Sequence, residues 1–225
     1  MTIYKENMKG TKNKEIYIAG SISRPCEQRW HSEISEKLIG MGYTTYAPAE
    51  NKSINDKTNK PQPLDIYEGD VSKLKSCDIL LVELHGGKQD GTIWECGWAC
   101  GWNERNREME ALLQMVDTMF SVTQKMAEDK GINVSQSVKD LSQSVSGEQD
   151  PHYDPIIESK KFFKEQSKKD KVIFFYTSNT RLLNNAIYDG IPSESLNHLV
   201  LGGFVKFGRN LGSPDEMLKF MEEYK

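Results

Sequence analysis

The chain of 225 residues lacks several features that would place it in a broad class at once. No apolar run approaches the roughly 20 residues that a membrane-spanning helix needs. The lysine-bearing N-terminus has no hydrophobic stretch of the kind found in secretory signals. An excess of basic residues is also missing, since the formal net charge is −4 and the pI is about 5.7. These absences argue against a membrane protein, a secreted protein and a general binder of nucleic-acid polymers or anionic membranes. We therefore expect a cytoplasmic protein.

Cysteine is scarce, and its spacing does not indicate a metal site. In a cytoplasmic protein the thiols are expected to be reduced. Cys96 and Cys100 are four residues apart, which suits one face of a helix, but no second pair of Cys or His lies close in the sequence. The pattern favours small buried side chains over metal ligands. The sequence thus gives no reason to expect a metal ion or an organic cofactor.

What the sequence does contain is an alternation of apolar segments with two different periods. The expected strands are 15–19, 44–48, 78–84, 171–177 and 203–207, and the expected helices are 25–41, 64–76, one from about Thr92 and one from Ser213. The run DILLVEL is apolar throughout, as in a strand that is covered on both faces. This order predicts an α/β fold: a flavodoxin-like or Rossmann-like, doubly wound, five-stranded parallel sheet in the order 2-1-3-4-5.

Residues 104–170 interrupt this alternation with a charged and largely polar segment. Apolar residues at spacings of three and four predict one amphipathic helix in it, and a serine-rich loop that we expect to be flexible follows. The apolar stripe of that helix consists of Leu112, Met115, Met119, Val122 and Met126. We interpret the chain as a single domain, 1–225, with a helical, partly flexible insertion at 104–170. The stripe could pack on the domain core or on another subunit.

The predicted topology places a ligand site where two strands end. In open α/β sheets ligands bind outside the carboxyl ends of the strands, at the point where the strand order reverses. Gly20 and Ser21 follow the first strand, and the loop 85–91 follows the third, so both should reach this point. The first strand ends in AGSIS and has no G-x-G-x-x-G, which argues against a dinucleotide-binding protein.

Several side chains near this point have both a structural and a functional interpretation. Thr92 and Glu95 have the spacing of a capping box, in which the glutamate would only satisfy backbone donors. Alternatively, the helix N-terminus points Glu95 into the crevice, where the helix dipole would favour the ionised form that a nucleophile needs. Asp70 borders the apolar stripe of its helix, Asp90 suits a turn, and Tyr17 suits the core.

Taken together, four segments resemble the nucleoside 2-deoxyribosyltransferase family. They are IYIAGSI, PLDIYEGDVSKLKSCDILLVEL, DGTIWECGWA and NNAIYDG. The similarity covers residues 15–103 and 171–225 and leaves the insertion unmatched. The most specific element is G-T-x-x-E-x-G, whereas A-G after a strand is common. The resemblance implies an enzyme that transfers 2-deoxyribose between nucleobases with retention at C1′.

The resemblance also implies roles for individual residues. Glu95 would attack the anomeric carbon and form a covalent deoxyribosyl-enzyme, with Asp70 assisting proton transfer and contacting sugar hydroxyls. Tyr17 would orient the nucleophile, Asp90 would meet the base, and Asn184 would reach into the site of a neighbouring subunit in a homo-oligomer with shared active sites. Two departures stand out. Asp90 directly precedes Gly91 where the family usually leaves one residue between, and the element at Asn184 lacks the usual methionine.

The residue types agree with this chemistry, and two other functions stay open. Displacing a base with retention needs a carboxylate nucleophile and a proton donor and acceptor, as in retaining glycosidases, but no metal. One alternative is hydrolysis of 2′-deoxynucleoside 5′-monophosphates, because Gly20-Ser21-Ile22 with Arg24 and Arg29 resembles the first loop of those N-glycosidases. Against it, Gln89 and Asp90 stand where those enzymes carry a serine. The other alternative is a non-catalytic nucleotide sensor. In each case the partners are small molecules.

Overall fold

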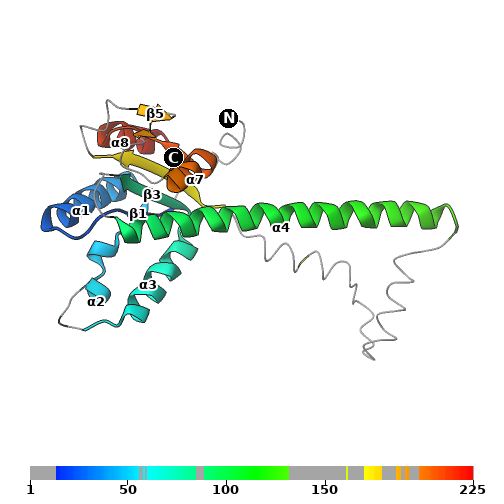
Figure 1. The fold of residues 1–225 in the computed structure, drawn as a ribbon, viewed down its shortest axis with the longest axis horizontal. Helices are drawn as coiled ribbons and strands as arrows, with labels where there is room; N and C mark the ends of the chain where they lie inside the picture. Colours follow the sequence, from blue (N-terminus) through cyan, green and yellow to red (C-terminus); the bar gives the residue numbers. More distant parts are fainter. Residues whose placement is uncertain are drawn as a thin grey trace. The chain divides into compact units, whose positions relative to one another are not determined.

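The chain divides into two compact units. Figure 1 shows the helices and strands of the described residues. The computed structural model describes residues 14–55, 58, 60–84, 89–131, 161, 170–178, 186–188, 191–192 and 198–224. One unit comprises Met1–Trp102 and Lys171–Lys225, and the other comprises Asn103–Asp170. No helix in the described ranges combines the length and the apolar character required to cross a membrane.

The first unit is built on a parallel sheet whose order agrees with the prediction. Its strands are β1 (Glu15–Ala19), β2 (Thr44–Tyr46), β3 (Ile79–Leu84), β4 (Val172–Thr177) and β7 (Gly208–Asn210). They run in the order β2-β1-β3-β4-β7, and each adjacent pair is parallel. This is the five-stranded 2-1-3-4-5 arrangement, in which the order reverses between β1 and β3. A separate antiparallel pair joins β5 (Ala186–Tyr188) to β6 (Ile191–Pro192).

Helices begin where the sequence supplies proline and an acid at fixed positions. The helical segments are α1 (Pro25–Gly40), η1 (Pro48–Glu50), α2 (Lys52–Asn55), α3 (Pro63–Ser76), α4 (Asp90–Glu128), α7 (His198–Phe207) and α8 (Pro214–Glu223). Four of them, α1, η1, α3 and α8, have proline in the first turn, where its missing N–H costs nothing. Ser213 caps α8 and accepts from Glu216 N at 3.3 Å. Gly42, with φ of +95°, turns the chain after α1.

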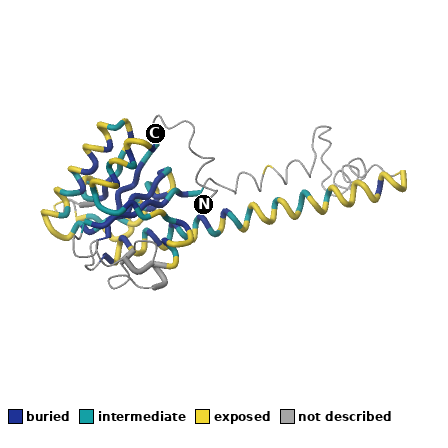
Figure 2. Tube along the Cα trace, turned by 90° about the horizontal axis from the view of Figure 1, so that it is seen from above, coloured by how far each residue is buried: buried dark blue, intermediate teal, exposed yellow. Residues whose placement is uncertain are grey.

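Both faces of the sheet are covered, so the strands are the most deeply buried part of the chain (Figure 2). On one face, the β1, β3 and β4 side chains pack against α1 and α8 through Ile34, Leu38, Met217 and Met221. On the other face, the alternate side chains pack against α3, the start of α4 and α7, and Cys96 belongs to this core. All six residues of β3 are buried, as the apolar run predicts. Alternation along β1 therefore sends Tyr17 toward α3 and α4.

Two secondary-structure predictions are wrong. The strand expected near 203–207 is the end of α7, because Phe204 and Phe207 are three residues apart and both buried, as on one face of a helix. The last strand of the sheet follows at 208–210. It starts at a glycine because a Cβ at Gly208 would lie 2.9 Å from the Phe175 ring. The other concerns segment 49–63, where polar residues together with Pro61 and Pro63 predict a surface loop, but which includes the end of η1 and all of α2.

The helix expected from Thr92 begins two residues earlier and is much longer than the first unit requires. It runs without a break from Asp90 to Glu128, and so crosses the boundary between the two units. No proline lies within it to stop or kink it. The inserted segment therefore begins as a continuation of α4, and the second unit includes the amphipathic stretch predicted for it.

Candidate active site

The centre of the candidate site is a contact between β1 and α4. Tyr17 lies in the middle of β1 with no exposed surface, and Glu95 lies in the second turn of α4. The Tyr17 hydroxyl donates a hydrogen bond of 2.6 Å to Glu95 Oε1, so one carboxylate oxygen is bound by a side chain that is itself fixed in the core. The carboxylate is partly buried and is held by a rigid donor.

This contact overturns the capping interpretation of Glu95. The capping box needed Thr92 as the residue before the helix, but α4 begins at Asp90. Ile93 N instead donates to Gln89 O at 2.8 Å, and Thr92 is buried inside the first turn. Glu95 is consequently too far into the helix to serve its terminal N–H groups, and its side chain turns to Tyr17.

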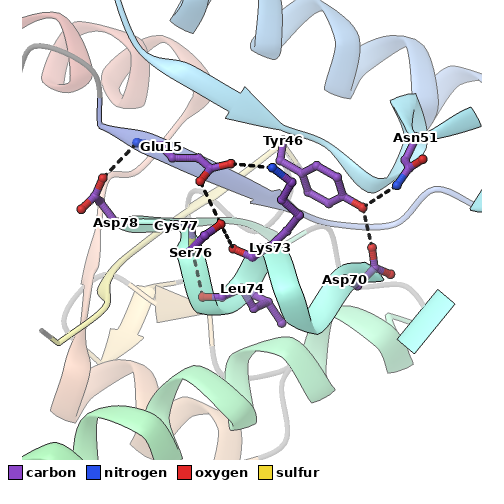
Figure 3. A network of polar contacts seen from close by, with 9 residues as sticks. All are labelled: Glu15, Tyr46, Asn51, Asp70, Lys73, Leu74, Ser76, Cys77 and Asp78. Atoms are coloured by element: carbon purple, nitrogen blue, oxygen red, sulfur yellow. Dashed lines mark hydrogen bonds and ion pairs between the residues drawn. The ribbon is translucent and has the colours of Figure 1, made fainter. Parts of the chain in front are cut away.

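A second tyrosine and a second acid lie beside the first pair. Tyr46 is in register with Tyr17 on the neighbouring strand, and the two ring centroids are 5.2 Å apart. The Tyr46 hydroxyl donates to Asp70 Oδ1 of α3 at 2.8 Å and accepts from Asn51 Nδ2 at 3.1 Å. Figure 3 shows Tyr46 with Asn51 on one side of its hydroxyl and Asp70 on the other. Packing of the two rings thus brings two tyrosine–carboxylate pairs together.

The electrostatics of this cluster favour proton uptake by its acids. Burial raises the pKa of Glu95 to about 8; the hydrogen bond from Tyr17 lowers it and the charge of Asp70 raises it. Burial also raises the pKa of Asp70, against the lowering effect of the bond from Tyr46. The pKa values of both tyrosines are raised, mainly by burial, so their hydroxyls remain protonated donors. The helix dipole expected to favour the ionised form of Glu95 is outweighed, since that effect fades beyond the first turn.

This arrangement has the elements of paired-carboxylate chemistry. Two acids whose pKa values are raised by burial lie within electrostatic range of each other, and each accepts a bond from a neutral tyrosine. In such pairs one group can react as a carboxylate while the other carries a proton. Acids whose pKa values are shifted by burial and by a charged neighbour mark a candidate functional site.

In the loop after β1, where the sequence predicts a ligand site, the side chain of Glu27 accepts hydrogen bonds from the nearby donors. Ser21 Oγ donates to Glu27 Oε2 at 2.8 Å, and Arg24 N donates to the same oxygen at 2.9 Å. The Arg24 guanidinium lies 3.3 Å from Glu27 Oε1. The donors at the N-terminus of α1 are therefore already bound to a carboxylate. Arg29 lies further along α1, in the wall of a surface groove of about 660 Å³ that includes neither Glu95 nor Asp70.

Beneath Gly20 lies a buried pair that sequence reasoning missed. His31 Nε2 and Glu83 Oε2 are 3.0 Å apart, and both side chains are almost completely buried. A Cβ at Gly20 would lie 2.5 Å from His31 Nε2, so this position requires glycine. The available signal was Glu83 itself, an acid inside the apolar run DILLVEL. Tyr46 and Asn51 were missed too, although a tyrosine in a strand beside Tyr17 could have been noticed.

The remaining predicted site residues are placed less centrally. Asp90 is exposed at the first residue of α4, five positions before Glu95. Gln89 is buried and donates from Nε2 to Glu83 O at 2.9 Å. Asn184 lies outside the described residues. Among the residues that are described, no group of three or more His, Cys, Asp or Glu side chains could hold a metal ion.

Comparisons with known proteins agree with the fold. The model of the family described as nucleoside 2-deoxyribosyltransferase matches residues 16–136, a range that includes Tyr17, Asp70, Asp90 and Glu95. A conserved protein from Enterococcus faecalis V583 superposes with a TM-score of 0.53 at 16% identity, over 94% of this chain and 99% of that one. A 2-deoxyribosyltransferase from Bacillus psychrosaccharolyticus superposes with a TM-score of 0.43 at 12% identity, over 94% and 92%. No curated protein sequence matches.

Proposed function

Because the chain belongs to the nucleoside 2-deoxyribosyltransferase family, we propose that it transfers 2-deoxyribose from one nucleobase to another through a covalent bond to Glu95. The observation that carries the proposal is the position of this carboxylate. It is bound by a buried tyrosine at 2.6 Å, lies within electrostatic range of a second acid, and has a pKa raised by burial to about 8. A group held in this way is oriented for attack and poorly solvated, which favours nucleophilic reactivity once it is ionised.

The proposed reaction has two displacements at C1′ of the sugar. In the first, Glu95 Oε2 bonds to C1′ and the C1′–N bond to the leaving base breaks, while the protonated Asp70 carboxyl gives its proton to that base. In the second, a nitrogen of the incoming base bonds to C1′, the ester bond to Glu95 breaks, and Asp70 recovers a proton from the incoming base. Each displacement inverts C1′, so the product retains the original configuration. Tyr17 holds Oε1 throughout and keeps the attacking oxygen in place.

The loop after β1 favours nucleosides over nucleoside 5′-monophosphates as substrates. The donors that could bind a phosphate there, Ser21 Oγ and the Arg24 N–H, are bonded to Glu27 at 2.8 and 2.9 Å. A phosphate would have to displace this carboxylate or lie beside it, and two adjacent anions repel. On this basis we favour the transferase over the 5′-monophosphate hydrolase.

That preference has a direct test. Glu27→Gln should increase kcat/KM for a 2′-deoxynucleoside 5′-monophosphate by about tenfold relative to the corresponding nucleoside, because one repulsive charge is removed. Glu36→Gln, on the exposed surface of the same helix, is the matched control. If the wild-type protein already prefers the monophosphate, the substrate assignment is wrong, whatever the variant does.

The decisive experiment for the chemistry is intact-mass analysis. The protein is mixed with a 2′-deoxynucleoside and quenched in acid, and a mass increase of one deoxyribosyl group is expected for the wild type and not for Glu95→Gln. Release of free base without any adduct on the wild type, at quench times shorter than one turnover, would reject the covalent step. Ligand binding that survives in Glu95→Gln, combined with no base release from the wild type, would instead support the nucleotide sensor.

Transfer and hydrolysis are separated by a second base. With a 2′-deoxynucleoside alone, a transferase should release little free deoxyribose. Addition of a different free base should then give the exchanged nucleoside at a rate that depends on the concentration of that base. Turnover that is unchanged by the acceptor, with deoxyribose as the product, would establish the hydrolase alternative.

The assembly and cellular location implied by the family are part of this proposal. An oligomer would allow Asn184 of one copy to complete the site of another. An exposed apolar patch on α3 and α4 offers a surface for such a neighbour: Leu64, Tyr67 and Trp94 are each at least 45% exposed, and the rings of Tyr67 and Trp94 meet edge to face at 5.6 Å. We expect the protein to act in the cytoplasm, where all four of its free thiols would stay reduced.

A further inference from the structure

A series of hydrogen bonds in the candidate site begins at the start of α2 and ends on Asp70. Asn51 directly precedes α2, and its Oδ1 accepts from Ser53 N at 3.2 Å, as the side chain of an N-cap residue does. Its backbone N–H donates to Pro48 O at 3.1 Å, so Asn51 is also held by η1. The segment between β2 and α3 thus fixes an amide group beside the hydroxyl of Tyr46.

The bonds from Ser53 determine which end of the Asn51 amide faces Tyr46. A backbone N–H can only donate, and Ser53 directs both its N–H and, at 2.6 Å, its hydroxyl to the same amide oxygen. If the amide were turned over, two N–H groups would point at each other at the start of α2. The NH₂ group of Asn51 is therefore the end that faces the Tyr46 oxygen, at 3.1 Å.

The Tyr46 hydroxyl has a single proton, and the Asn51 amide leaves one direction for it. The hydroxyl oxygen accepts from Nδ2 of Asn51, so its proton is donated on the other side, to Oδ1 of Asp70 at 2.8 Å. Burial raises the pKa of Tyr46, so the hydroxyl keeps this proton. When Asp70 is protonated, its carbonyl oxygen is the better acceptor. Oδ1 consequently retains the bond from Tyr46, and the proton of Asp70 lies on Oδ2.

We propose that Tyr46 and Asn51 are positioning residues, which fix Oδ2 as the oxygen of Asp70 that gives a proton to the leaving base and takes one from the incoming base. This role rests on the proposed function. As the base takes the electron pair of the C1′–N bond, the Oδ2–H bond breaks, the proton moves to a nitrogen of the base, and Asp70 becomes a carboxylate. The bond from Tyr46 then has an ionised acceptor and becomes stronger, which favours release of the proton. Figure 3 shows the second oxygen of Asp70 turned away from Tyr46.

The pair of Tyr46 with Asp70 repeats the arrangement of Tyr17 with Glu95. Tyr17 holds Oε1 of Glu95 and leaves Oε2 for the sugar. In the same way, Tyr46 holds Oδ1 of Asp70 and leaves Oδ2 for the base. The two tyrosines are in register on adjacent strands, and their ring centroids are 5.2 Å apart. The positions of the two reacting oxygens therefore depend on one pair of packed aromatic rings.

The first test compares a base that needs a proton to leave with one that does not. A neutral purine leaves with a proton from Asp70, whereas a purine made cationic by methylation at N7 leaves as a neutral molecule. Tyr46→Phe keeps the ring against Tyr17 and removes the hydroxyl. In a single turnover it should slow release of the neutral base about tenfold, and release of the cationic base less than about twofold. Asp70→Asn should show the same selectivity with a larger effect, and Glu95→Gln should slow both.

A matched control removes a hydroxyl from the other face of the sheet. Tyr43→Phe deletes a buried hydroxyl that donates to Met221 O, and it should release both bases as the wild type does. If Tyr46→Phe slows both bases equally, or neither, the role assigned to Tyr46 is wrong while the proposed function stands. If Glu95→Gln slows neither base, the proposed function itself is rejected.

The second test reverses the direction of the Tyr46 bond. Asn51→Asp keeps the bonds from Ser53 but offers Tyr46 a carboxylate in place of the NH₂ group, so the hydroxyl proton should turn away from Asp70. Asn51→Ala offers no acceptor, and Tyr46 can still donate to Asp70. We expect Asn51→Asp to slow release of the neutral base about tenfold, and Asn51→Ala no more than about threefold. If Asn51 served only as a cap for α2, the change to Asp would be the milder of the two.

A double variant separates the direction of the Tyr46 bond from the effect of the added charge. In a Tyr46→Phe background there is no hydroxyl to redirect, so Asn51→Asp should slow release of the neutral base by less than about twofold. The same loss in both backgrounds would mean that the negative charge acts on the site directly. A larger loss in Asn51→Ala than in Asn51→Asp would mean that Asn51 serves the helix alone. Either result would overturn the positioning role of Asn51.

Discussion

Two glutamates, Glu83 fully buried and Glu95 partly buried, lie on opposite faces of the sheet and are held very differently. Glu83 is the last residue but one of β3 and lies 3.0 Å from His31, a partner that can carry a positive charge. Glu95 in α4 is bound by the neutral hydroxyl of Tyr17, and its nearest charged influence is another acid, Asp70. One carboxyl group is thus provided with a potential counter-charge, and the other is not.

The comparison shows which of the two acids lowers the stability of the fold when it is ionised. Burial of an acid without a cation disfavours the ionised form, and for Glu95 the result is a pKa of about 8, where an ordinary value is 4.5. Glu83, which is enclosed beside His31 and Gly20, has the surroundings of a structural residue. Glu95, whose ionised form is disfavoured by burial, has the surroundings typical of a reaction centre. Burial of a carboxyl group alone would not distinguish Glu83 from Glu95; the charge of the neighbouring groups does.

The largest expected effect on catalysis comes from removing the carboxyl group of Glu95, which has no positively charged partner among the contacts described above. Glu95→Gln should lower kcat/KM for nucleobase exchange at least about 1,000-fold, because the nucleophile is lost while the Tyr17 bond can still form. The measurement is exchange of base between a 2′-deoxynucleoside and a free base. Loss of less than tenfold would mean that Glu95 is not the nucleophile and that the comparison has selected the wrong glutamate.

The same variant should alter the pH dependence of stability. Since the pKa of Glu95 is raised from 4.5 to about 8 on folding, the folded protein binds the proton more tightly than the unfolded chain. Stability therefore falls as the pH rises from about 4.5 to about 8, by on the order of a few kcal/mol in total. Glu95→Gln should lose this dependence and melt at a higher temperature than the wild type at pH 8.5. Parallel melting curves at pH 5 and pH 8.5 check the sign.

A smaller but still large effect is expected at Asp70. Asp70→Asn removes the proton donor and acceptor and should lower kcat/KM by roughly 100- to 1,000-fold. The charge of Asp70 raises the pKa of Glu95, so the same change should move the rising limb of the pH–rate profile to lower pH. Glu68→Gln, on the exposed surface of the same helix, is a suitable control. An unshifted profile would contradict the electrostatic link between the two acids.

The fold was predictable because its signals are local. Strand and helix periods, glycine stops and prolines at helix starts lie within a few residues of the elements they define, and together they gave the strand order 2-1-3-4-5. The error at 203–207 has the same origin. A short apolar segment with Gly202 and Gly203 fits a strand or a helix equally well, and the contacts of Phe204 with the sheet decide for a helix.

The site was predictable only in part, because its decisive contacts join distant residues. Tyr17 and Glu95 are 78 positions apart and Tyr46 and Asp70 are 24 apart, so no local pattern shows that these side chains bond. The family resemblance pointed to three of the four, and Tyr46 required the register of β1 with β2. The capping interpretation of Glu95 failed for the reverse reason, since the local spacing of Thr92 and Glu95 was outweighed by a hydrogen bond from Tyr17 of β1, distant in the sequence.

Tyr17 offers a change that should shift the pH profile in the opposite direction. Its hydrogen bond lowers the pKa of Glu95, so Tyr17→Phe should move the rising limb of kcat/KM to higher pH, with a loss of about tenfold at pH 7. Tyr43→Phe, which removes a buried hydroxyl bonded to Met221 O, is the control for a lost core hydrogen bond. A shift to lower pH in Tyr17→Phe would refute the role assigned to this bond.

The smallest effect on catalysis is expected at the other glutamate, and it is the sharpest test of the comparison. Glu83→Gln keeps the size of the side chain but removes the charge that faces His31, in a place where both groups are almost fully enclosed. Breaking a buried pair of this kind should cost about 1–3 kcal/mol. For a chain of this size that corresponds to a fall in melting temperature of roughly 2–4 °C for each kcal/mol.

Catalysis should change little in Glu83→Gln, because Glu83 lies on the opposite face of the sheet from Tyr17 and Asp70. We expect kcat to stay within about twofold of the wild-type value, and the pH profile to shift by no more than a few tenths of a pH unit. A shifted profile at full thermal stability would show that Glu83, too, acts on the reaction, and that a histidine partner does not mark a purely structural acid.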